Sequence, residues 1–170
     1  FYQPENTIWY AGGHMKTWTM RTIHIGINEI DEGQYNKPFI TDYSPTCFML
    51  FNATVFNKIG SMDENYFVYY DDTDYIWRMN QAGLSILYES KAIIKHKVSS
   101  STGGEFSPFT VYYTNRNRIY FIRKNFPIIK KHIVLSYVIL ITALKLVKTP
   151  KVSRNYIFKG IKDGLKMRLS

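Results

Sequence analysis

The sequence has a single cysteine, few acidic residues in its second half and no long apolar run. Cys47 alone cannot form an internal disulfide or a cysteine-based zinc cluster, and it suits a reducing compartment. The most apolar run, Ile133 to Leu144, covers 12 residues without a charge. Spanning a bilayer takes roughly 20 apolar residues. We therefore expect a buried or interfacial helix there rather than a transmembrane one.

Charge is unevenly distributed along the chain. The first 98 residues carry 8 Lys/Arg and 11 Asp/Glu, a net charge of −3, whereas the last 72 carry 14 and 2, a net charge of +12. Strongly basic segments bind phosphates, which indicates nucleic acid, anionic lipid or a diphosphate as a partner. The 170 residues are 45% hydrophobic, which is enough for one core plus an appendage. The sequence begins at Phe1 without a methionine or a signal pattern, so we expect a segment of a longer protein.

Short apolar runs separated by turn residues predict a mixed α/β chain. A strand is expected at 8–11, a surface loop at 23–34, and strands at 84–88 and 92–98. The strand region 39–51 is interrupted by Pro45. Helices are expected at 53–59 after the cap Asn52, at 73–82 before Gly83, and at 109–125 after Pro108.

Three aspartates lie within four positions directly before the predicted helix 73–82. Asp71 suits an N-cap and Asp74 suits the third helical position, where a carboxylate can reach back to the cap amide. Capping explains these two, and Asp72 is then surplus. Neighbouring negative charges disfavour each other's ionised form, so Asp72 is a candidate general base. Helix capping alone and catalysis both remain open from this pattern.

Two further features have a structural and a functional interpretation. Alternation along 92–98 places Ile94, His96 and Val98 on one face of a strand. His96 is then either a core histidine or a metal ligand that needs carboxylate partners. The pair Gly12-Gly13 is either a turn at a strand end or a place where backbone approaches a ligand.

An ordered series of motifs resembles the acceptor-binding half of family 2 glycosyltransferases, with bacterial rhamnosyltransferase-like members closest in character. The resemblance covers residues 8 to about 127. It rests on Thr41-Asp42-Tyr43, Cys47-Phe48-Met49-Leu50, Val55 to Gly60, Met62-Asp63-Glu64, Phe67, Tyr70 to Asp74, Trp77-Arg78, Gly83, His96 to Ser100, Tyr112-Tyr113 and Arg116-Asn117-Arg118. It implies that 1–127 is the acceptor-binding part of a GT-A mixed sheet. Residues 128–170 lie beyond the resemblance, and their pattern predicts a basic, apolar helical appendage close to a membrane.

The resemblance also implies roles for the aspartate segment. Such enzymes transfer a sugar from a nucleotide-sugar in one inverting displacement, and a carboxylate removes the acceptor proton. This role falls on Asp72. Asp71 and Asp74, with Trp77 and Arg78, would position the helix and the acceptor.

Other implied roles concern the donor. His96 matches a histidine that completes the site of a divalent metal, Mn²⁺ or Mg²⁺, and Gly12 and Gly13 match a donor loop. Arg116 and Arg118 match a segment near the diphosphate, to which a guanidinium binds bidentately. Exposed helix arginines are an equally ordinary interpretation of the last two.

One departure from the family pattern is the missing Asp-x-Asp motif, which belongs to a preceding nucleotide-binding half together with a βαβ unit. We therefore expect the 170-residue chain alone to bind neither dTDP- nor UDP-sugars and to be inactive. The acceptor class implied is a glycan or a lipid-linked saccharide of cell-surface polysaccharide synthesis.

The basic end predicts a location. Ile157, Ile161, Leu165 and Leu169 are spaced by four among lysines, as in a basic amphipathic helix. We expect peripheral attachment at the cytoplasmic face of a bacterial membrane, and a solvated appendage or subunit contact is the alternative. A non-catalytic membrane-associated or partner-binding fragment also stays open. A nucleic-acid-binding module is disfavoured because no such motif accompanies the charge.

Overall fold

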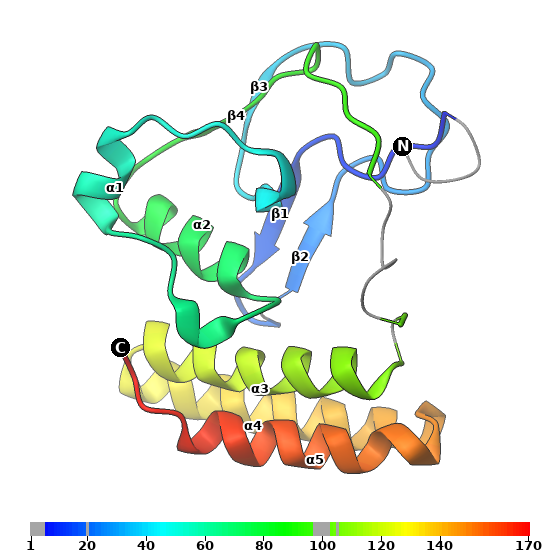
Figure 1. Ribbon diagram of the computed structural model, residues 1–170, viewed down its shortest axis with the longest axis vertical. Helices are drawn as coiled ribbons and strands as arrows, with labels where there is room; N and C mark the ends of the chain where they lie inside the picture. Colours follow the sequence, from blue (N-terminus) through cyan, green and yellow to red (C-terminus); the bar gives the residue numbers. More distant parts are fainter. Residues whose placement is uncertain (1–5, 20, 97–102, 105) are drawn as a thin grey trace. The chain divides into compact units, whose positions relative to one another are not determined.

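The computed structural model describes residues 6–19, 21–96, 103–104 and 106–170 (Figure 1). The chain divides into two compact units. Unit 1 comprises residues 1–17, 21–62 and 72–98, and unit 2 comprises 18–20, 63–71 and 99–170. The boundary expected after residue 127 therefore falls inside unit 2. Assigning acceptor binding to 1–127 stays a prediction.

Unit 1 contains two small antiparallel sheets, so the fold is mixed α/β as expected. β1 (Gly13–Lys16) pairs with β2 (Arg21–His24), and Gly13 lies opposite His24. β3 (Phe39–Thr41) pairs with β4 (Ile86–Tyr88), and Thr41 lies opposite Ile86. The larger GT-A sheet implied by the resemblance stays a prediction.

Several strand boundaries differ from the expectation. Residues 8–11 form no strand, and β1 begins only at Gly13, beyond the apolar run. The predicted loop 23–34 contains the end of β2, because Ile23 and His24 pair with β1. The predicted strand region 39–51 keeps three strand residues, and Pro45 precedes a short 3₁₀ helix, η1 (Thr46–Phe48).

The strand expected at 92–98 is also wrong for its described part. Residues 92–96 have no regular secondary structure, and Ile93 and Ile94 are exposed. The alternation in this segment therefore does not mark a core face. Val98 lies outside the described residues.

The helices of unit 1 follow the sequence closely. α1 (Thr54–Ile59) begins where Asn52 Oδ1 accepts the amide of Thr54 at 3.0 Å. It ends at Gly60, whose φ of 74° favours glycine. α2 (Asp71–Gln81) belongs to unit 1 from Asp72 onward and is followed by Gly83 with φ of 70°. The core of unit 1 contains Tyr43, Val55, Tyr75, Ile76, Met79 and Ile86.

Unit 2 is built on three helices after a short 3₁₀ turn, η2 (Glu64–Tyr66). α3 (Pro108–Asn125) begins at the predicted place, where Ser107 Oγ accepts the amide of Thr110 at 3.1 Å. α4 (Ile128–Lys145) follows Pro127. After η3 (Leu146–Lys148), α5 (Lys151–Lys166) follows Pro150. Both α4 and α5 lie beside α3 (Figure 1).

The buried face of α5 differs from the predicted stripe. It consists of Ser153, Ile157, Gly160 and Gly164. Leu165 and Leu169, which the spacing groups with Ile157, are exposed. Three of these four residues are small, and Gly160 and Gly164 lie directly against α3. Within the described residues, no helix combines the length and apolar character needed to cross a bilayer.

Candidate active site around Asp72

A cluster of hydrogen bonds at the start of β1 positions the segment Thr41 to Tyr43. The Thr41 hydroxyl donates to the carbonyl of Gly13 at 2.8 Å and accepts from the amide of Gly13 at 2.7 Å. The same carbonyl accepts the amides of Asp42 at 3.2 Å and Tyr43 at 3.1 Å. Thr41 is buried, so these bonds are shielded from water. The backbone of Tyr43 is therefore fixed against β1.

Tyr43 and Thr73 hold the carboxylate of Asp72 in one orientation. The Tyr43 hydroxyl donates to Oδ2 of Asp72 at 2.6 Å. Oδ1 accepts the backbone amide of Thr73 at 2.6 Å and the Thr73 hydroxyl at 3.1 Å. Asp72 is half-buried. Each carboxylate oxygen can accept two hydrogen bonds, and Oδ2 therefore retains a lone pair for an incoming hydroxyl.

The tyrosine that contacts Asp72 stays protonated. Burial first, and then the negative charge of Asp72, raises the pKa of Tyr43 far above its ordinary value. A neutral phenol can donate to the carboxylate but cannot compete with it as a base. The ring of His24 stacks on Tyr43, with centroids 5.9 Å apart.

His24 is a neutral partner in this cluster. Burial lowers the pKa of His24, and its Nδ1 donates to the carbonyl oxygen of Trp9 at 3.0 Å. The Trp9 ring lies 4.7 Å from the rings of both His24 and His96. Asp72, Tyr43, His24 and His96 therefore belong to one connected set of side chains in unit 1.

A cavity of about 790 Å³ opens in unit 1 beside this cluster. Its lining is mostly apolar and aromatic and includes Trp9, Tyr88, His96 and Cys47. Partial burial first, and then the negative charge of Asp72, raise the pKa of the Cys47 thiol. The cavity has the size and lining typical of a site for a small organic ligand.

The predicted neighbours of Asp72 have mainly structural contacts. Asp74 is fully buried and accepts a hydrogen bond from Nε of Arg78 at 3.0 Å. Arg78 also donates to the carbonyls of Ile59 and Ser61, which ties α2 to the end of α1. Trp77 is half-buried on α2, and Asp71 begins that helix. Asp74 and Arg78 therefore brace the helix that carries Asp72.

His96 is the only predicted metal ligand, and its surroundings do not complete a metal site. Among the described residues, no group of three or more His, Cys, Asp or Glu side chains is arranged to hold a metal ion. His96 is half-buried against Trp9. The described residues alone therefore do not make up a divalent-metal site.

The two predicted diphosphate-binding arginines belong to unit 2 and make hydrogen bonds within it. Arg116 donates to the carbonyls of Asn65 and Tyr66, each at 2.8 Å. Arg118 is buried and donates to the carbonyl of Thr19. Both guanidinium groups thus stabilise unit 2.

The glycine pair serves close packing. Gly12 has a φ of 95°, and a Cβ there would lie 2.6 Å from the ring of Phe39. A Cβ on Gly13 would lie 2.9 Å from the carbonyl of Ile23 on β2. The predicted ligand-approach role stays a prediction, and the turn at a strand end is not what forms here, because residues 8–11 are not a strand and Gly13 begins β1.

Sequence reasoning missed the residues that orient Asp72. Tyr43 appeared only as part of a motif, Thr73 as the first helical residue, and His24 in a supposed loop. Pairing of Gly13 with His24 brings His24 next to Tyr43, whose backbone amide donates to the Gly13 carbonyl, and a sheet register of this kind leaves no short-range pattern.

Comparison with known proteins finds no match: no family model, no curated protein and no solved structure is similar to this chain.

Proposed function

We propose that this chain is the acceptor-binding part of an inverting family 2 glycosyltransferase in which Asp72 is the general base. The observation that carries the proposal is the orientation of the Asp72 carboxylate by Tyr43 and Thr73. Merely capping a helix needs no phenol donor from a segment 29 residues away. Fixed geometry is what a base needs to meet a substrate hydroxyl.

The reaction is a single displacement. The acceptor hydroxyl oxygen attacks the anomeric carbon of the sugar as Asp72 takes the hydroxyl proton. The bond from the anomeric carbon to the diphosphate oxygen breaks, and the nucleoside diphosphate leaves with the electron pair. Tyr43 remains protonated and holds the carboxylate throughout. The donor would be a dTDP- or UDP-sugar, with rhamnose as one candidate, and the acceptor a glycan or lipid-linked saccharide.

Donor binding is assigned to the preceding nucleotide-binding half that the motif resemblance implies. The same half would supply the remaining ligands of a Mn²⁺ or Mg²⁺ ion alongside His96. When bound, such an ion would compensate the charge of the departing diphosphate. A lipid-linked acceptor fits a protein attached peripherally to the cytoplasmic face of the membrane.

The test is an Asp72→Asn substitution in the full-length protein that contains this chain. Loss of a general base typically lowers the rate by about 10² to 10⁴-fold, with unchanged donor affinity and unfolding temperature. Glu32→Gln, an exposed loop acid, is the matched control. Transfer by Asp72→Asn at the wild-type rate would exclude Asp72 as the base.

A second candidate, a non-catalytic partner-binding or membrane-associated fragment, draws on a different observation. Arg78, Arg116 and Arg118 all donate to backbone carbonyls within their own units. This is the pattern of structural arginines. Full-length protein that transfers no sugar from either nucleotide, although folded, would favour this reading.

A further inference from the structure

The outer face of α4 is an apolar stripe with no partner in the described chain. We define it as Ile133, Tyr137, Leu140 and Leu144. They are spaced i, i+4, i+7 and i+11, so they share one side of the helix. Leu140 is 58% exposed and Leu144 is 63% exposed. A row of large apolar side chains exposed over three turns marks an interaction surface.

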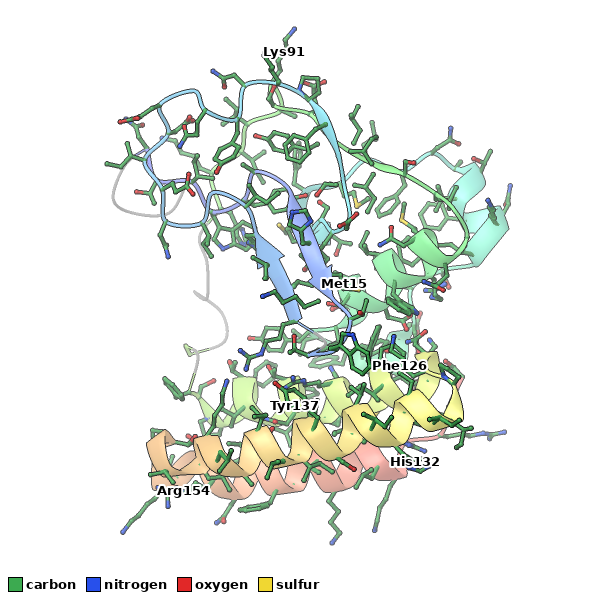
Figure 2. All side chains as sticks on the ribbon, turned by 180° about the vertical axis from the view of Figure 1, so that it is seen from behind. Met15, Lys91, Phe126, His132, Tyr137 and Arg154 are labelled. Atoms are coloured by element: carbon green, nitrogen blue, oxygen red, sulfur yellow. The ribbon has the colours of Figure 1, made fainter. Side chains whose placement is uncertain are left out.

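The opposite side of α4 already has a role inside unit 2. Val134, Val138 and Thr142 are buried, and α4 lies beside α3. The hydroxyl of Thr142 donates a hydrogen bond to the carbonyl of Val138 in the same helix at 2.7 Å, so this buried polar group is satisfied. The α4 outer face is thus not the core side of the helix. Figure 2 shows α4 toward the viewer, with Tyr137 and His132 labelled along it.

The charges around the stripe indicate what covers it. α4 contains no acidic residue, and its ends carry Lys130, Lys131 and Lys145. Residues 106–170 contain one acid, Asp163, which accepts a hydrogen bond from Tyr112 at 2.9 Å. An uncharged stripe between cationic ends complements a surface with anionic headgroups above an apolar layer. A second copy of the chain would bring the same cationic ends together, which disfavours self-association.

α5 is the less suitable membrane face, although the sequence spacing favours it. Its Ile157 is buried on the α3 side. Two of its exposed apolar residues, Phe158 and Leu165, lie among the exposed Lys159, Lys162 and Lys166. Burying that face in lipid would desolvate several charges.

We propose that the α4 outer face is the part of this protein that inserts into an anionic lipid bilayer surface, with the helix lying in the plane of the interface. This inference rests on the proposed peripheral attachment and assigns the residues that achieve it. The apolar side chains of the stripe enter the lipid layer, and the lysines near the ends of α4 are attracted to the anionic headgroups.

The test is flotation of the 170-residue chain with vesicles of phosphatidylcholine alone or of equal parts phosphatidylcholine and phosphatidylglycerol. We expect binding to the anionic vesicles only, weakened by high salt because exposed charges are screened. The double substitution Leu140→Gln/Leu144→Gln should lower the partition coefficient about tenfold or more, because both side chains lose their apolar contact. The control Phe158→Gln/Leu165→Gln changes two exposed apolar residues on α5 and should remain within about twofold of wild type by the same argument. Circular dichroism confirms that both variants fold.

Each outcome decides a separate point. Absence of wild-type binding to anionic vesicles would overturn peripheral attachment. Equal loss in both double variants, or loss only in the α5 variant, would overturn the assignment to α4. A wild-type dimer that becomes monomeric in the α4 variant would make a second copy the occupant. Sugar transfer to a soluble acceptor by the full-length protein should be unchanged in the α4 variant, which separates this inference from the role of Asp72.

Discussion

The phenol of Tyr43 donates a hydrogen bond of 2.6 Å to Oδ2 of Asp72, joining the segment after β3 to the first turn of α2. Tyr43 is itself fixed by the carbonyl of Gly13 and is almost fully buried. The carboxylate is thus held by an element that cannot move independently of β1. Tyr43 is therefore a positioning residue for the proposed base.

Replacing Tyr43 with phenylalanine should lower kcat about tenfold or more and leave the KM for the donor nearly unchanged. A hydrogen bond to a charged group contributes about 1.5–3 kcal/mol, and Phe preserves the buried ring. Steady-state kinetics of the full-length enzyme measure the effect. Tyr112→Phe, which removes a hydroxyl that donates to Asp163 at 2.9 Å within unit 2, is the control and should leave kcat unchanged. A wild-type kcat in Tyr43→Phe would show that the bond has no catalytic role.

Asn117 holds the strained segment that precedes Asp71. Its side-chain amide donates to the carbonyls of Tyr66 at 2.9 Å, Val68 at 2.6 Å and Tyr69 at 2.9 Å. Phe67, Tyr69 and Tyr70 all have positive φ, which is costly for bulky side chains. A fully buried asparagine with three carbonyl partners therefore stabilises a backbone that the residues themselves disfavour.

Asn117→Ala should accordingly destabilise the protein by about 3 kcal/mol, because several buried carbonyls lose their donor. Hydrogen exchange should rise first at residues 67–71, as strain is released locally. Urea unfolding and exchange mass spectrometry measure the two effects. Asn155→Ala, an exposed change on α5, should alter neither. Unchanged exchange at 67–71 would contradict the assigned role.

The hydrogen bonds of Asp63 make the stability of unit 2 dependent on pH. Lys124 Nζ, the Tyr120 hydroxyl and the Ser170 hydroxyl all donate to its Oδ2, at 2.7, 2.8 and 2.8 Å. Burial alone would raise the pKa of Asp63, but these bonds outweigh it and hold the pKa well below its ordinary value. The depressed pKa means that this stabilisation is fully present above the unfolded pKa of about 3.9 and is lost as the pH falls toward the folded value.

Asp63→Asn should therefore cost about 3 kcal/mol at neutral pH, because the half-buried Lys124 loses its carboxylate partner and the hydroxyls of Tyr120 and Ser170 lose a charged acceptor. The difference from wild type should shrink progressively below about pH 4. Denaturant titrations at a series of pH values measure this window. Glu64→Gln, an exposed neighbour, is the control and should follow the wild-type curve. A pH-independent difference would show that shape, not charge, is responsible.

The parts of the fold that local chemistry determines were predictable. Caps and stops at Asn52, Gly60, Gly83 and Pro108 place three helices nearly where the structure has them. The strands were not predictable to this level. Their short length means that pairing, not alternation, defines them, and the segment around His96 remains unpaired in its described part.

The candidate site was half predictable for the same reason. Asp72 could be identified because helix capping requires only two of the three carboxylates in this segment. Its partner Tyr43 could not be identified, since the contact joins residues 29 apart through the packing of β1 against the Thr41 segment. The arginines were assigned by motif, and their contacts with the carbonyls of Asn65 and Thr19, which are distant in the sequence, could not be inferred from it.

The close approach of α5 to α3 gives the last prediction. A Cβ on Gly160 would lie 2.5 Å from the carbonyl oxygen of Tyr112, and one on Gly164 would overlap that of Arg116. Arg123 also donates to the carbonyl of Gly164 at 2.8 Å, which depends on this proximity. Both glycines are buried in the helix. Because glycine has no side chain, the backbones of α3 and α5 can approach each other closely at these two positions.

Gly160→Ala and Gly164→Ala should therefore each destabilise the protein, by about 1–3 kcal/mol for overpacking. The direction of the change in stability is diagnostic, because alanine in an unobstructed helix is more stable than glycine by about 0.5–1 kcal/mol. Thermal unfolding followed by circular dichroism measures the change. The matched control Lys162→Ala lies on the exposed side of α5 and should shift the midpoint little. A higher midpoint in either glycine variant would mean that α5 does not pack on α3 through these residues.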